Sequence, residues 1–210
     1  MAYDLEEQEQ IEQLKAWWNR YGAIAMGLLT VALLIVLGWQ GWAWYQNNQA
    51  TQARGYFEAL ERASEQPGTD AMPRIVAAME TLKTDFAQTD YAGRGALVAA
   101  QALQARDDLD GAQEALEWLS QSNHEALAPV ASLRLAGLLL DTEQYDQALA
   151  TLADAPPAFE GLYADRRGDI YAAKGDREQA LEQWREALTK IGVNQGLASA
   201  LQLKIDTVGG

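Results

Sequence analysis

The sequence predicts an all-α fold in which a single transmembrane helix at the N-terminus is followed by an α-solenoid of helix-turn-helix repeats and a C-terminal capping helix. Three observations predict it. Residues 23–38 are almost wholly apolar, small residues recur at a spacing near 34 in the second half of the chain, and no sustained alternation of a β-strand occurs. A chain of 210 residues has room for such an anchor and one modest domain.

Residues 21–45 form the predicted transmembrane helix. No charged residue lies between Arg20 and Arg54, and an α-helix from Tyr21 to Trp39 would cover roughly 27 Å, close to the roughly 30 Å hydrocarbon core of a bilayer. Amphipathic rings flank the run at both ends, as is typical of membrane–water interfaces. These membrane-interface residues are Trp17, Trp18, Tyr21, Trp39, Trp42 and Trp44. A cleaved secretory signal or a buried core helix would be the alternative, but the preceding tail is acidic, whereas a signal begins with basic residues.

Residues 1–20 are predicted to be a cytoplasmic acidic tail. Its apolar residues recur at nearly helical spacing, so the tail either lies in the membrane interface as an amphipathic helix or frays. Lys15 and Arg20 before the span are matched by Arg54 and Arg62 beyond it, so the positive-inside count is a draw. Arg20 lies directly against the span, which favours a cytoplasmic N-terminus and an exported C-terminal domain.

A repeat with a period near 34 follows the anchor. Ala112, Ala148 and Ala180 are separated by 36 and 32 residues, and a second set of small residues keeps the same spacings. This is the period of the tetratricopeptide unit, whose paired helices approach closely at small residues. We therefore predict three tetratricopeptide-like repeats over residues 91–194; chance alignment of an alanine-rich helical bundle is the alternative. The repeat signature comprises Ala100, Ala112, Ala136, Ala148, Gly168, Tyr171, Ala180 and Trp184.

Two segments flank these repeats. Residues 46–90 are predicted to continue the membrane helix and to form a degenerate first hairpin, with a break at Pro67-Gly68 and a new helix starting near Pro73. Residues 195–210 carry an apolar stripe and are predicted to cap the solenoid.

Stacked hairpins present an extended concave face that binds a peptide or a partner helix. By the repeat register, the first helices of the three units contribute eight residues to this partner-binding groove: Leu97, Gln101, Leu133, Gly137, Leu140, Asp165, Asp169 and Ala172. Packing between repeats is the alternative role for these positions.

Composition excludes several classes of chemistry. The chain has no cysteine and one histidine, His124, which excludes disulfides, thiolate metal sites, iron–sulfur clusters and a histidine-rich metal site. The formal net charge is −14 and the basic residues are scattered, with Arg166 and Arg167 the only adjacent pair, so we expect no nucleic-acid partner. We expect no catalytic, cofactor-binding or metal-binding residues, no cofactor, and a protein that is not an enzyme.

Three motifs resemble the family of bacterial ancillary SecYEG translocon subunits: WWNRYG at 17–22, DRRGD at 165–169 and LQLKID at 201–206. The resemblance covers nearly the whole chain and includes no catalytic signature. It implies a single-pass inner-membrane protein with a cytoplasmic N-terminus and a periplasmic tetratricopeptide-like domain. It also implies association with the SecYEG translocon and with a membrane-anchored periplasmic prolyl isomerase chaperone.

The predicted function is therefore that of a membrane-anchored accessory of the SecYEG export channel, which recruits periplasmic chaperones or contacts exported client polypeptides as they emerge. The lipid bilayer is the remaining expected partner. An envelope regulatory scaffold for a signalling or cell-division partner is the alternative, and composition does not separate the two. A periplasmic enzyme would require turnover that fails when one buried carboxylate is altered.

Overall fold

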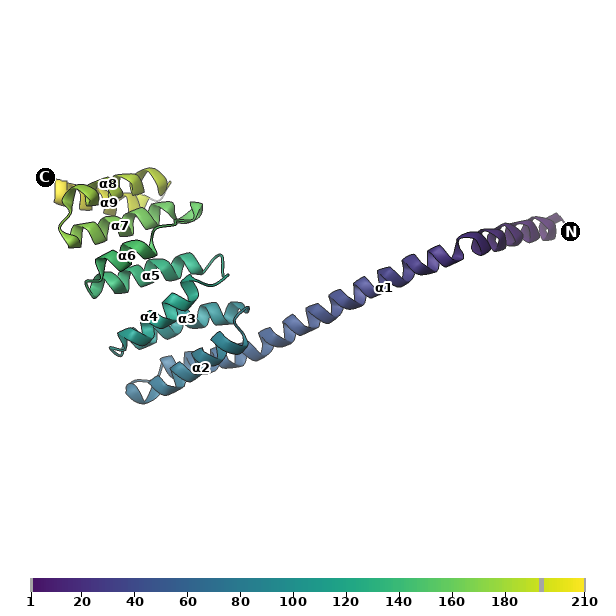
Figure 1. The fold of residues 1–210 in the computed structure, drawn as a ribbon, viewed down its shortest axis with the longest axis horizontal. Coiled ribbons are helices and arrows are strands. Elements are labelled where there is room, and N and C mark those ends of the chain that lie inside the picture. Colours follow the sequence, from purple (N-terminus) through teal and green to yellow (C-terminus); the bar gives the residue numbers. More distant parts are fainter. Residues whose placement is uncertain (1, 193–194, 210) are drawn as a thin grey trace. The chain divides into compact units, whose positions relative to one another are not determined.

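Helices make up the regular structure of the chain. The computed structural model describes residues 2–192 and 195–209, and within these ranges the elements are α-helices and two short 3-10 helices, with no strand (Figure 1). The predicted all-α fold class is confirmed. The chain divides into two compact units, Met1–Gln49 and Ala50–Gly210.

Helix α1 spans Ala2–Ser64 and forms the described part of the first unit. It is the one helix of the described chain that is long and apolar enough to cross a membrane. The hydroxyl of Thr30, the only polar side chain between residues 23 and 38, donates to the carbonyl oxygen of Met26 at 2.8 Å. Every polar group of this run can thus be satisfied inside the helix, as a hydrocarbon environment requires.

The last turns of α1 belong to the second unit and pack against its first helices. Ala53, Phe57 and Leu60 are buried in the hydrophobic core of that unit. The Phe57 ring lies 5.6 Å from that of Tyr91, and the guanidinium of Arg94 lies over its face at 5.1 Å. Exposing these three apolar side chains to water would cost free energy, so the end of α1 is part of the domain rather than a free linker.

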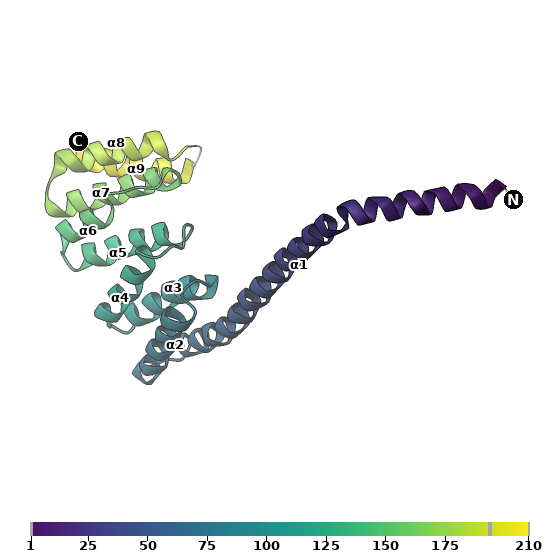
Figure 2. The same ribbon diagram turned by 45° about the vertical axis from the view of Figure 1, so that its right-hand side comes forward.

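The solenoid consists of consecutive helix pairs that stack one upon the next (Figure 2). After the 3-10 helix η1 (Thr69–Ala71) comes α2 (Met72–Asp85), which has Pro73 in its first turn. The pairs are α3 (Asp90–Gln104) with α4 (Leu109–Ser120), α5 (Ala128–Asp141) with α6 (Tyr145–Thr151), and α7 (Glu160–Lys174) with α8 (Arg177–Lys190). The 3-10 helix η2 (Pro157–Phe159) precedes α7, and α9 (Gln195–Gly209) packs on α8.

The turn inside each pair has the same backbone conformation. Asp107, Glu143 and Gly175 all have positive φ, at 61°, 61° and 85°, and they occupy equivalent positions just after the first helix. In each turn the following amide donates to a carbonyl oxygen near the end of that helix, as from Gln144 to Leu139 at 2.8 Å. This is the left-handed helix ending that glycine adopts most easily. Only the third repeat uses glycine there, so the common turn was not evident from the sequence.

Small residues allow the paired helices to approach closely. Ala112, Ala136, Ala148 and Ala180 are completely buried. A Cβ added at Gly168 would overlap the indole ring of Trp184. The repeat signature thus lies at helix contacts, where a larger side chain would need space that the packing does not leave.

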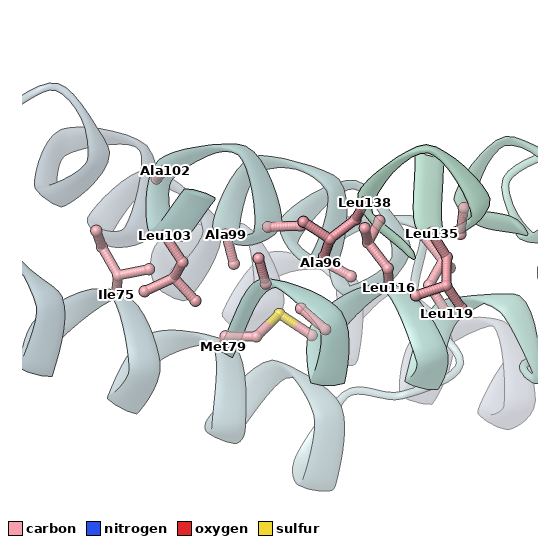
Figure 3. Close-up of a cluster of buried hydrophobic side chains, with 14 of the residues drawn as sticks. Ile75, Met79, Ala96, Ala99, Ala102, Leu103, Leu116, Leu119, Leu135 and Leu138 are labelled. Atoms are coloured by element: carbon pink, nitrogen blue, oxygen red, sulfur yellow. The ribbon is translucent and has the colours of Figure 1, made fainter. Parts of the chain in front are cut away.

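The core of the second unit has two clusters. The larger one extends from Ala53 in α1 to Ile170 in α7, and its middle contains Leu103, Leu116 and Leu135 together with several alanines (Figure 3). The smaller one joins α7, α8 and α9 through Ala164, Ala180, Trp184, Ala187, Leu201 and Ile205. Helix α7 contributes to both clusters and so links them.

Candidate partner-binding site

The apolar part of α1 presents its side chains outward. Leu28, Leu34 and Ile35 are each more than 60% exposed. The six predicted interface residues are exposed as well: Trp17, Trp18, Tyr21, Trp39, Trp42 and Trp44. An apolar surface this continuous is unfavourable in water, whereas a bilayer would cover its middle and accommodate the rings at its edges.

The eight predicted groove residues fall into three environments. Leu97, Leu133 and Leu140 are half-buried against the larger core cluster, and Ala172 is half-buried against the smaller one. Asp165 and Asp169 form ion pairs with α9. Only Gln101 and Gly137 line an open hollow.

Lys204 of α9 holds the two aspartates of α7. Its Nζ atom lies 2.6 Å from Oδ1 of Asp165 and 2.6 Å from Oδ1 of Asp169, and the same oxygen of Asp169 accepts a hydrogen bond from Nε1 of Trp184 at 3.1 Å. Partial burial acts to lower the pKa of Lys204, but its hydrogen bonds to both carboxylates outweigh that effect and raise the pKa. The contact closes this end of the predicted groove, because both carboxylates are engaged inside the domain.

An open hollow of about 400 Å³ lies among α3, α4, α5 and α7. We call it the arginine hollow. Its polar lining consists of Gln101 and Gln104 from α3, Arg134, Gly137 and Asp141 from α5, and Arg166 from α7, and its apolar wall includes Ala100, Leu116 and Leu138. Sequence reasoning found Gln101 and Gly137 here but missed both arginines, because the groove positions were taken from a single register along each helix.

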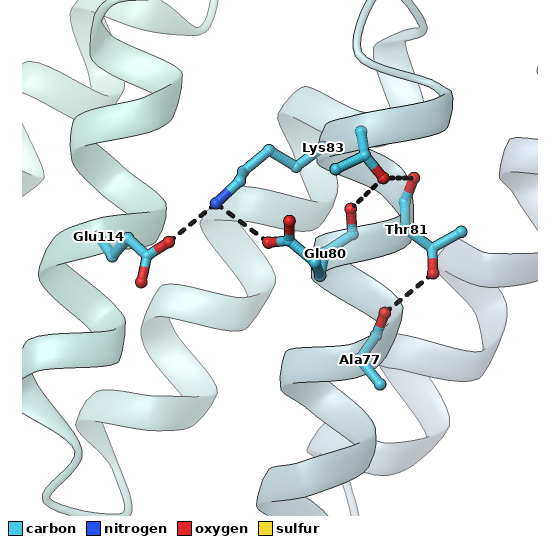
Figure 4. Close-up of polar contacts among 6 residues, drawn as sticks. Ala77, Glu80, Thr81, Lys83 and Glu114 are labelled. Atoms are coloured by element: carbon cyan, nitrogen blue, oxygen red, sulfur yellow. Dashed lines mark hydrogen bonds and ion pairs between the residues drawn. The ribbon is translucent and has the colours of Figure 1, made fainter.

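Two other hollows each include a side chain that bonds elsewhere in the domain. A small one lined by Val76, Met79 and Leu103 is bordered by Lys83, whose Nζ atom bridges Glu80 at 3.0 Å and Glu114 at 2.8 Å (Figure 4). The hydrogen bonds to Glu114 and then Glu80 raise the pKa of Lys83.

The other hollow lies beside His124, whose Nε2 atom is 3.0 Å from the carbonyl oxygen of Ala87. His124 thus joins the turn before α3 to the turn before α5. Within the described residues, no group of three His, Cys, Asp or Glu side chains is placed to hold a metal ion.

Arg106 fastens the end of α1 to α3. Its guanidinium donates to the carbonyl oxygens of Ser64 at 2.9 Å, Gly68 at 3.2 Å and Ala102 at 2.7 Å, and also to that of Gln66. The carbonyls of Ser64, Gln66 and Gly68 lie at and just beyond the end of α1, where carbonyl groups lack intrahelical donors, and that of Ala102 lies near the end of α3. This contact was not predictable from the sequence, since the acceptors at the end of α1 are backbone atoms about forty residues before Arg106.

These features define a class of protein: a helical-repeat domain preceded by a helix that can span a membrane. Residues 15–210 match the tetratricopeptide repeat-like domain family. The chain belongs to the family of ancillary SecYEG translocon subunits, as the sequence motifs indicated. It is 30% identical over 211 residues to the subunit of Neisseria gonorrhoeae, covering 99% of this chain and 100% of that protein.

Two further relatives carry the same name. The Haemophilus influenzae protein is 30% identical over 89% of this chain and 91% of its own length, and the Escherichia coli protein is 29% identical over 96% of each. No solved structure matches the chain. Family membership and the apolar helix together point to the inner membrane, and an ancillary subunit with a tetratricopeptide-like domain is a non-enzymatic kind of protein.

Proposed function

We propose that the protein is a non-enzymatic, membrane-anchored accessory of the SecYEG export translocon. The observation that carries this proposal is the similarity, over nearly the full length, to proteins named as ancillary subunits of that translocon. A span beside the channel would keep the repeat domain at high local concentration near emerging chains. Contacts of modest affinity would then suffice.

The proposed topology has a cytoplasmic tail at residues 1–20, a span at 21–45, and a periplasmic domain formed by the hairpin region 46–90, the repeats 91–194 and the cap 195–210. Arg20 immediately before the span supports a cytoplasmic N-terminus. Protease added to spheroplasts should digest the repeat domain of the full chain. Protection of that domain until the inner membrane is permeabilised would contradict the orientation.

The repeat domain would recruit a membrane-anchored periplasmic prolyl isomerase chaperone or contact exported client polypeptides. The open arginine hollow supports this role, because Arg134 and Arg166 make no hydrogen bond or ion pair among the described residues. The engaged carboxylates at Asp165 and Asp169 make the last repeat a less favourable docking position. The docking face would thus lie on the earlier repeats.

In vivo photo-crosslinking tests the proposal. A photoreactive residue at Leu34, which is 63% exposed on the span, should trap SecYEG subunits, and one at Gln101 should trap the chaperone or nascent exported chains. Leu203, exposed on α9, provides a matched position away from the hollow. Recovery of a signalling or cell-division protein, with no channel component from Leu34, would instead establish an envelope regulatory scaffold.

A further inference from the structure

The arginine hollow contains two guanidinium groups that have no partner among the described residues. Arg134 is exposed on α5 and Arg166 is half-buried on α7, and neither makes a hydrogen bond or an ion pair within the part of the chain that the structure describes. The neighbouring Arg167 differs sharply. It donates to Gln183 at 2.6 Å and to the carbonyl oxygen of Leu152 at 3.1 Å, and it pairs with Glu186 at 3.6 Å. Thus one arginine of the adjacent pair is used by the fold and the other is left in the hollow.

The two unpaired guanidinium groups line one hollow, and that of Arg166 packs close to α5. A Cβ placed on Gly137 would lie 3.5 Å from Nη1 of Arg166, so the Arg166 guanidinium lies directly over the α5 backbone at this position. Arg134 is three residues earlier on α5 and therefore on the same helix face. Two positive groups that line one hollow favour a bound anion, because an anion relieves their mutual repulsion.

We propose that the arginine hollow binds a partner segment through its carboxylate side chains. This inference rests on the proposed function, since it names the chemistry by which the repeat face would hold a chaperone or a client. The planar guanidinium matches a carboxylate in bidentate geometry, and acidic peptide motifs are recognised by arginine clusters. The side-chain amides of Gln101 and Gln104, which line the hollow from α3, both donate and accept hydrogen bonds and thus suit a peptide backbone.

The charge around the hollow favours a peptide over a polyanion. The chain has a formal net charge of −14, which repels nucleic acid and strongly anionic surfaces at long range. A segment with one or two carboxylates among neutral residues is repelled much less by this net charge and can still contact both arginines. Isolated carboxylates are therefore the ligand that the charge pattern selects.

Asp141 adds a positional preference. It lines the same hollow seven residues after Arg134, which corresponds to about 10 Å along α5. An extended peptide covers about this distance in three residues. The preferred segment thus has a carboxylate and, about three residues away, a basic side chain that faces Asp141.

The binding test uses the full chain in nanodiscs of zwitterionic lipid. The probe is a short fluorescein-labelled peptide with the core Glu-Leu-Ser-Lys, and its controls replace Glu by Gln or by Lys. Fluorescence anisotropy should show saturable binding below about 1 mM, at least about tenfold weaker binding of the Gln peptide, and weakening by added salt. Equal binding of the Glu and Gln peptides, or no binding of the Glu peptide at about 1 mM, would overturn the proposal.

Variants assign the binding to the hollow. The combined change Arg134→Gln and Arg166→Gln should remove at least about tenfold of the affinity, and Lys at both positions should restore part of it, because lysine keeps the charge but not the bidentate geometry. Arg185→Gln is the matched control: Arg185 is exposed on α8 with no partner among the described residues, and it does not line the hollow. An equal loss in Arg185→Gln would show a non-specific charge effect and contradict the proposal.

Two further measurements distinguish this inference from a phosphate site and from the proposed function. If inorganic phosphate or phosphatidylglycerol vesicles bind in an arginine-dependent manner and the Glu peptide does not, the hollow is a phosphate site and the peptide proposal is wrong. Crosslinking from Leu34 to SecYEG subunits should persist in the double Gln variant. If the unaltered protein gives no crosslink from Leu34 to SecYEG subunits, the proposed function itself is contradicted. The peptide measurement would still decide the role of the hollow.

Discussion

Single atoms decide how closely the helices of a repeat can approach. At Gly168 the indole ring of Trp184 occupies the space where a Cβ would lie, and Nε1 of that ring donates to Asp169 on the same helix. The glycine, the tryptophan and the aspartate therefore form one packed contact between α7 and α8. The motif that identified this repeat in the sequence has this contact as its physical cause.

Replacing Gly168 by alanine should destabilise the domain. The added methyl group forces the Trp184 ring or the α7 backbone to move, which we expect to lower the free energy of unfolding by about 1–3 kcal/mol. Chemical denaturation of the detergent-solubilised full chain, followed by circular dichroism, measures this change. Gly55→Ala is the matched control, because no atom lies within 4 Å of a Cβ there and alanine favours helix by up to about 1 kcal/mol. Equal effects of the two changes would contradict the close contact.

Lys204 gives the domain a pH-dependent contribution to stability. Its pKa in the folded protein is raised above the ordinary value of 10.5, so the contribution is complete below that value and is lost as the pH rises through the higher folded pKa. We expect Lys204→Gln to lower the melting temperature at pH 7, and the difference from the unaltered protein to shrink as the pH rises above 10.5 and through the higher folded pKa. Lys190→Gln is the control, because the ion pair of Lys190 with Glu160 is more exposed than that of Lys204 with Asp165. A pH-independent difference would show that packing, not charge, accounts for the effect.

Each helix pair is closed by a turn that demands left-handed backbone, although two of the three turns lack glycine. Asp107 and Glu143 take the conformation that Gly175 takes in the third repeat. An L-residue adopts it at a cost of about 1 kcal/mol or more, and the amide hydrogen bond after the turn compensates only partly. The turn geometry is therefore a property of the element, and the residue type adjusts its stability.

Glu143→Gly should stabilise the second repeat. Glycine adopts the φ of 61° without the Cβ clash, so we expect the free energy of unfolding to rise by up to about 1 kcal/mol despite the larger entropy of the unfolded chain. The reverse change, Gly175→Ala, should destabilise by a similar amount. Thermal melts of both variants decide the matter, and a destabilised Glu143→Gly variant would mean that the Glu143 side chain contributes more than its backbone conformation costs.

For the whole molecule, local patterns were sufficient to predict the fold class. The uncharged run at residues 23–38 and the spacing of Ala112, Ala148 and Ala180 are each determined by neighbours along one helix or one hairpin. Contacts between distant segments were not predictable. Lys204 contacts Asp169, which is 35 residues away in the sequence. This contact depends on how α9 is rotated about its own axis, and the sequence of one helix does not determine that rotation.

The site shows the same limit. The assumed register placed Asp165 and Asp169 in the open groove, but α9 covers them, and the free arginines lie at other positions of the same helices. Arg134 and Arg166 look like ordinary surface charges in the sequence. Only the absence of a partner among the described residues, together with Gly137 beneath one of them, distinguishes them.

Because the core is divided into two clusters, the domain has a weaker junction at α7, where the two clusters meet. Tyr163 and Ile170 of α7 belong to the larger cluster and Ala164 to the smaller one, so the last repeat and its cap are joined to the rest mainly through one helix. In a solenoid each repeat is stabilised by its neighbours, and a weak junction allows a terminal repeat to open by itself. Amide hydrogen exchange should then be faster in α8 and α9 than in α3 and α5, and a brief opening there would lengthen the accessible binding face without unfolding the domain.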